Sequence, residues 1–156
     1  MKKYKIKAYV LIIFDRIEIK LYKMSVIIMK FNDWLKDVLR LECLLFSKTD
    51  IYRLIEQRQN EKCLKYDERK ELYMEIHSVF QRLINILEES CPNLTKEDLI
   101  FCCLVKSGLG KSIIGYCTGS VSSQAFNQRK YRIKKKMKEM KCEELFELLY
   151  QSNDFV

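Results

Sequence analysis

The stretch "LTKEDLIFCCLVKSGLGKSIIGYCTGSVSSQAFNQRKYRIKKKM", residues 94–137, decides the fold class. Thr95 is of a residue type that caps helix amino termini, and Asp98 three residues later gives it the spacing of a capping box. Glycines at 108 and 119 interrupt a pattern in which apolar residues recur every three or four positions. The stretch therefore predicts three consecutive helices, over about 96–107, 111–118 and 122–140.

The rest of the chain also favours an all-α fold. Among 156 residues there are four Gly and one Pro, while 48% are apolar and 32% charged. Such a composition allows a packed core and favours helices over a many-turned β fold. Two apolar stripes with helical spacing lie upstream: Phe31, Trp34, Val38, Leu41, Leu45, and then Leu72, Ile76, Val79, Leu83, Ile86, widened by Phe80 and Leu87.

These patterns divide the chain into three predicted parts. Residues 1–30 are rich in Ile, Val and Tyr and fit a β-hairpin, an irregular helix or a reading frame begun too early. Residues 31–91 form a helical module in which the 72–87 helix packs on the helix around Trp34 or, as a short coiled coil, on a second copy. Pro92 ends this module, and residues 92–151 form a helix-turn-helix domain of three or four helices. The fourth helix, in "KCEELFELLYQ", caps the core or pairs two copies.

Basic charge is concentrated in the third helix of this domain. The net charge is +8, and residues 129–141 carry +7 of it, with eight basic residues and one acid. A local basic patch suggests a polyanionic partner, although solvated Lys runs are common. One side of the helix is predicted to face the core: Ala125, Phe126, Arg129, Ile133 and Met137. The candidate DNA-binding residues are hydroxyls, amides and cations suited to base edges and phosphates: Ser122, Ser123, Gln124, Asn127, Gln128, Lys130, Tyr131, Lys134 and Lys135.

The same residues carry a resemblance to a known family. Leu94-Thr95, Gly108-Leu109 and Ser122 with Ala125-Phe126 resemble the carboxy-terminal helix-turn-helix domain of LuxR-type transcription regulators, which is related to region four of sigma factors. With "FSKTDIY" upstream, the chain also resembles the cytoplasmic end of bacterial regulators that carry tetratricopeptide repeats. The resemblance implies a bacterial, sequence-specific DNA-binding regulator that binds double-stranded DNA. It also implies RNA polymerase or another regulator as a protein partner. By the same resemblance, Asn127 stands at the position that most often faces DNA in LuxR-type domains.

A protein-interaction module and an enzyme are the two alternative function classes. A non-enzymatic protein-interaction module would use the 72–87 stripe as its surface and the helix-turn-helix core as a scaffold. Exposure of the third helix separates the two hypotheses, because a DNA-binding helix must be open to solvent. An enzyme is not expected, since His77 is the single histidine and "GLGKS" (108–112) follows a helix rather than the strand of a phosphate loop.

The cysteines and the amino-terminal apolar run bear on the compartment. None of the seven cysteines shows C-x-x-C spacing, so no metal or cofactor is expected. Cys102, Cys103 and Cys117 lie among apolar residues, which predicts buried free thiols and a reducing compartment. "AYVLIIF" (8–14) is too short to span a membrane and no cleavage site follows it. We therefore expect a cytoplasmic protein without a membrane contact.

Overall fold

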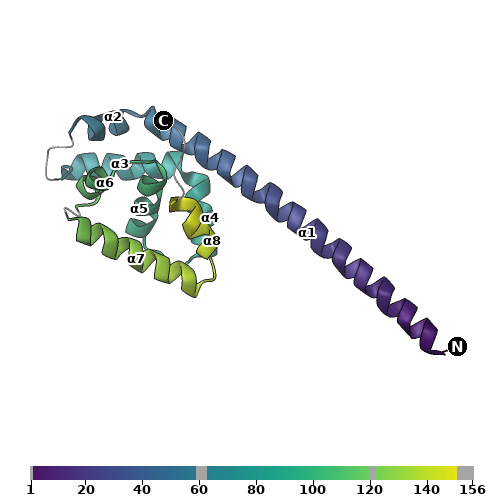
Figure 1. Ribbon diagram of the computed structural model, residues 1–156. Coiled ribbons are helices and arrows are strands. Elements are labelled where there is room, and N and C mark those ends of the chain that lie inside the picture. The colour runs from purple at the N-terminus through teal and green to yellow at the C-terminus, as the bar shows by residue number, and fades with distance from the viewer. Residues whose placement is uncertain (1, 59–62, 120–121, 151–156) are drawn as a thin grey trace. The chain divides into compact units, whose positions relative to one another are not determined.

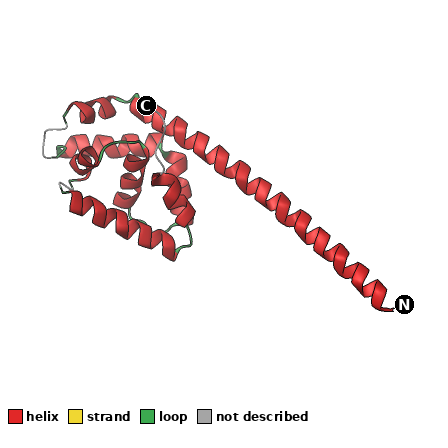
Figure 2. Ribbon diagram, viewed as in Figure 1, coloured by secondary structure: helices red, strands yellow, loops and turns green. Residues whose placement is uncertain are grey.

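The computed structural model describes residues 2–58, 63–119 and 122–150, with side chains from residue 16 onward. Within these residues every regular element is a helix (Figure 1, Figure 2), which confirms the all-α prediction. The helices are α1 (Lys2–Ser47), α2 (Asp50–Gln57), α3 (Tyr66–Val79), α4 (Gln81–Ser90), α5 (Lys96–Lys106), α6 (Lys111–Thr118), α7 (Ser123–Glu139) and α8 (Glu143–Tyr150). The chain divides into two units, Met1–Asp37 and Val38–Val156.

Helix α1 corrects two predictions. It is continuous from Lys2 to Ser47, so the hairpin alternative is wrong for residues 2–30. In the predicted stripe from Phe31 to Leu45 only Val38 is buried, while the other four side chains are 46–60% exposed. The buried residues are instead Leu35, Val38, Leu39, Glu42 and Phe46. Across the described residues, no helix combines the length and the apolar character needed to cross a membrane.

The predicted continuous helix over 72–87 is two helices, because the backbone bends at Phe80 (φ −92°, ψ 29°) between α3 and α4. No Gly or Pro marks this bend in the sequence. The backbone N–H of Arg82, in the first turn of α4, donates to the Glu42 carboxylate from α1 at 3.0 Å. Burial raises the pKa of Glu42 above its ordinary value, although the hydrogen bonds from the N–H groups of Arg82 and Leu83 oppose the rise. A carboxylate distant in sequence therefore caps α4.

Helix α5 forms the centre of the Val38–Val156 unit. All six side chains from Leu99 to Leu104 are at most 2% exposed, and α5 packs against α3, α4, α6 and α8. A helix that is apolar all round is stable only in such surroundings. The 72–87 stripe belongs to the same core, with fully buried Leu72, Ile76, Phe80, Leu83 and Leu87. The predicted domain boundary at 91/92 thus lies inside one compact unit.

The predicted burial of three cysteines is confirmed. Cys102, Cys103 and Cys117 are each fully buried, and all seven cysteines are free thiols. Burial raises the pKa of Cys117 to about 12, so its thiol stays protonated at neutral pH. These cysteines pack as small apolar side chains.

Leu72→Ala and Leu83→Ala should each lower the free energy of unfolding by about 2–5 kcal/mol, because each leaves a cavity at a fully buried site. Denaturant titration followed by circular dichroism measures the change. The control is Met74→Ala, since Met74 is 65% exposed on α3, and its effect should stay within about 0.5 kcal/mol. Similar small losses for all three variants would show that the 72–87 stripe is not core.

Candidate nucleic-acid interface

The start of α7 is set by a turn at Gly119 and a cap at Ser122. Helix α6 ends at Gly119, whose φ of 72° lies in the left-handed region, where glycine is favoured because it has no Cβ. Residues 120 and 121 lie outside the described part of the chain. Ser122 then accepts a hydrogen bond through its hydroxyl from the backbone N–H of Ala125 at 3.1 Å. This N-cap fixes the residue at which α7 begins.

The rotation of α7 about its axis is set by three apolar side chains. Phe126, Ile133 and Met137 are at most 6% exposed, as the sequence predicts. The ring of Phe126 lies 5.0 Å from that of Phe101 in α5. Arg129 places its guanidinium carbon 5.8 Å from the same Phe101 ring, so its side chain lies at the edge of the core. The opposite side of α7 consequently faces outward.

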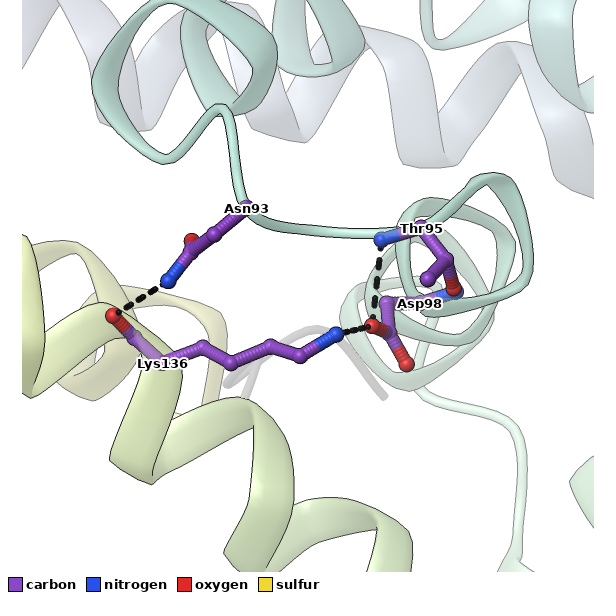
Figure 3. Close-up of polar contacts among 4 residues, drawn as sticks. All are labelled: Asn93, Thr95, Asp98 and Lys136. Atoms are coloured by element: carbon purple, nitrogen blue, oxygen red, sulfur yellow. Dashed lines mark hydrogen bonds and ion pairs between the residues drawn. The ribbon is translucent and has the colours of Figure 1, made fainter.

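A polar network ties the second half of α7 to the start of α5 (Figure 3). The ammonium of Lys136 donates to Asp98 Oδ2 at 2.6 Å, and the side-chain amide of Asn93 donates to the backbone carbonyl of Lys136 at 3.2 Å. Asp98 also closes the predicted capping box, because its Oδ2 accepts from the N–H of Thr95 at 3.1 Å. Burial alone would raise the pKa of Asp98, but the hydrogen bonds from Lys136 and Thr95 outweigh it and lower the pKa below its ordinary value. Lys136 is therefore committed to structure rather than to a ligand.

The outward side of α7 carries the predicted amides. Gln124, Asn127, Gln128, Tyr131 and Arg132 line a shallow, open hollow of about 750 Å³. All five are exposed, and Tyr131 is 70% exposed. The remaining predicted residues on this side are exposed as well: Ser122, Ser123 and Lys135. In the described part of the chain this surface is open to solvent along the length of α7.

Two of the predicted residues lie on the flank of α7 beside α8. The Lys130 ammonium lies 4.1 Å from the ring centroid of Tyr150. The Lys134 ammonium lies 3.8 Å from Glu147 Oε1 and 5.3 Å from the ring centroid of Phe146. Because α8 contacts both cations, they are separated from Gln124, Asn127 and Gln128, which form the amide row of the outward side.

Two cations that were not among the sequence candidates complete the outward side. Arg132 shares the hollow with Gln128, and Lys138 is exposed farther along α7. Within the residues that the structure describes, neither they nor Lys135 form an ion pair. Helical spacing would have identified both, since Arg132 follows Gln128 by four residues and Lys138 follows Tyr131 by seven.

This arrangement has the chemistry to bind duplex DNA. A helix with its side chains is about 10–12 Å across and fits a major groove about 12 Å wide. Asn and Gln amides form paired hydrogen bonds with adenine edges, while Arg and Lys bind guanine edges or phosphates. No protein-family model matches the chain, and no curated protein or solved structure matches it.

Asp98→Asn should lower the free energy of unfolding at pH 7 by about 1.5–3 kcal/mol, because it removes the charged acceptor of the Lys136 hydrogen bond. The folded pKa of Asp98 is lowered from 3.8, so this contribution is fully present above that pH and is lost as the pH falls below it. Urea denaturation between pH 7 and about pH 2 measures the difference between variant and wild type, which should shrink on acidification.

The control for this experiment is Asp33→Asn, an exposed aspartate in α1. It should leave the unfolding free energy within about 0.5 kcal/mol of wild type at each pH. A wild-type advantage over Asp98→Asn that stays constant down to the lowest pH would contradict the role given to the Asp98 carboxylate.

Proposed function

We propose that this protein is a sequence-specific DNA-binding regulator of transcription that places the first half of α7 in the major groove. One observation carries the proposal: α7 buries Phe126, Ile133 and Met137 while its amide row remains open to solvent. The short polar residues at its start would reach base edges, as in other helix-turn-helix proteins, and α6 would cross the backbone. The resemblance to LuxR-type domains agrees with this assignment.

The residues of α7 divide into two roles. Gln124, Asn127 and Gln128 would contact base edges and supply sequence preference. The unpaired cations of the outward side, together with Lys130 and Lys134 on the flank, would contact phosphates and supply affinity without sequence preference. As a transcription regulator in a bacterial cytoplasm, the protein would meet RNA polymerase or another regulator on the DNA.

The interaction-module hypothesis requires the 72–87 stripe to be a surface. Leu72, Ile76 and Leu83 are fully buried, and Val79 and Ile86 are partly buried. The stripe would have to leave the core before it could contact a partner, at a cost of about 1.5–3 kcal/mol for each large side chain exposed. The exposure of α7 and the burial of this stripe both favour DNA as the ligand.

Selection from a random duplex DNA pool tests the proposal. Purified full-length protein is mixed with the pool at moderate salt, and the bound fraction is sequenced over several rounds. The expected result is one enriched motif, since the amide row discriminates between bases. Binding without enrichment would reduce α7 to a phosphate-binding surface, and no binding at moderate salt would reject the DNA proposal.

Asn127→Ala should weaken binding to the enriched sequence by about 1–3 kcal/mol and relax the preference at one base position. Fluorescence anisotropy with the enriched duplex and its single-base variants measures both effects. Asn85→Ala is the matched control, because Asn85 is an exposed amide on α4, and it should leave both quantities unchanged. Equal weakening by Asn127→Ala on every duplex would contradict a base contact.

Lys135→Ala should weaken binding to all duplexes alike and reduce the slope of log affinity against log salt by about one unit, because one phosphate contact is lost. Lys134→Ala should have a smaller effect, since Lys134 is drawn toward Glu147. Lys48→Ala removes an exposed charge that lies outside α7 and controls for net charge. A salt slope that changes as much in Lys48→Ala as in Lys135→Ala would remove the special role of α7.

A further inference from the structure

Helix α1 exposes an apolar row within the Met1–Asp37 unit. Ile17, Met24, Ile27, Phe31 and Trp34 are 46–65% exposed. With Lys20 they follow a strict alternation of three and four residues, which is the a/d pattern of a heptad repeat. The same spacing continues in the sequence at Ile6, Val10 and Ile13, so eight of nine a/d positions over four heptads are apolar.

The period of this row indicates what kind of surface it fits. A strict seven-residue repeat drifts by about 20° per heptad around a straight helix, and therefore by about 80° over four heptads. If the helix lay straight on a flat surface, such as a lipid bilayer, the row would rotate away from that surface along the helix. It stays in contact with a second helix if the two supercoil around each other. The period favours a helical partner over a membrane surface.

The exposed area is compatible with a dimer. Leu21 and Ile28, each following a d position, widen the row and are 60% and 53% exposed. A whole aliphatic side chain has about 60–120 Å² and a whole aromatic one about 150–250 Å². Since these seven side chains are 46–65% exposed, they present roughly 300–600 Å² per helix. A pair would then bury roughly 600–1,200 Å² before the heptads at residues 6–14 are added, against the roughly 1,000 Å² of a specific interface.

The charges that flank the row favour one orientation of two identical helices. In a parallel pair each g residue faces the partner's e residue five positions on, which places Arg16 beside Leu21 and Lys23 beside Ile28. Their aliphatic stems can cover these side chains while the charged ends reach water. In an antiparallel pair g residues face g residues, so Arg16, Lys23 and Lys30 would face other cations. The parallel pair avoids this repulsion between flanking cations, and at the a, d, e and g positions from Arg16 to Trp34 it leaves Lys20 as the one cation that faces its own copy.

We propose that α1 forms a parallel, two-stranded coiled coil with α1 of a second copy of this chain. An identical helix in register brings Phe31 to Phe31 and Trp34 to Trp34, and it aligns the Lys20 layer with itself. The two other dimer interfaces that the sequence suggests, the 72–87 stripe and the carboxy-terminal helix, offer less surface. The 72–87 stripe is core, and α8 buries its Phe146 and Leu149.

Lys20 gives the proposal a distinctive consequence. A single polar residue in an otherwise apolar seam lowers the stability of a coiled coil while fixing its register. Replacing Lys20 with leucine should therefore strengthen self-association, whereas a helix that meets no partner helix gains nothing from the change. The pairing does not rest on DNA binding, although a two-fold pair would suit two half-sites.

Sedimentation equilibrium of the full chain at about 1–100 µM, where interfaces of this size associate, tests the pairing. Wild type should approach twice the 18.8 kDa mass of one chain and dissociate on dilution. Ile27→Glu should stay monomeric throughout, and Lys20→Leu should dimerise at roughly tenfold lower concentration. Ile19→Glu is the matched control, because Ile19 is 55% exposed but lies at a c position off the row, and it should behave as wild type.

Several results would overturn the proposal. These are a monomer at every concentration, a trimer or larger species, or a dimer that Ile27→Glu leaves intact. A monomer that sediments with anionic lipid vesicles, and loses this property in Ile27→Glu, would assign the row to a lipid surface instead. Circular dichroism of each variant shows that the chain is folded. Strong energy transfer between donor and acceptor labels on the amino termini of mixed chains is expected for the parallel pair, and its absence would reject that orientation.

Discussion

The burial of Phe126, Ile133 and Met137 is the constraint on which the candidate site depends. Each large apolar side chain removed from water contributes about 1.5–3 kcal/mol. Rotating α7 to expose these three would also bury amides and cations without partners, at a cost of several kcal/mol. The rotation of α7 is therefore well determined. The polar residues that lie between these apolar positions therefore form the exposed surface of α7.

Position along the axis of α7 is fixed by separate polar contacts at its two ends. Ser122 caps the start of the helix, and Lys136 ties its second half to Asp98. Asp98 also closes the cap of α5, so one carboxylate links the start of α5, the central helix of the core, to α7 (Figure 3). The candidate DNA-binding face is thus held by both packing and polar contacts, as a site that must fit a groove requires.

Features set by local chemistry could be predicted from the sequence, and features set by distant partners could not. The caps at Thr95 and Ser122 and the left-handed turn at Gly119 depend on a few neighbouring residues. The bend at Phe80 has no local signal, because the carboxylate that caps α4 comes from Glu42, forty residues earlier. Lys130 and Lys134 appear equivalent to Lys135 in the sequence, and only the position of α8 separates them.

The buried face of α1 could not be predicted from the sequence either. Periodicity predicts that a helix has an apolar face, but it does not say which of two neighbouring faces meets the core. Helical spacing marks the stripe from Phe31 to Leu45 as the apolar face for packing, whereas the buried residues include Leu35 and Leu39. The exposed row from Ile17 to Trp34 could have been found by counting heptads through residues 1–30, a segment that composition alone left ambiguous.

Amide chemical-shift mapping is the most direct test of the central claim that α7 reads DNA. The full chain, labelled with ¹⁵N, would be titrated with a short duplex that contains the enriched sequence. A DNA contact by α7 predicts the largest shifts in the first half of α7, from Ser123 to Arg132, with little change along α3. Largest shifts along α3 and α4, with α7 unperturbed, would contradict it.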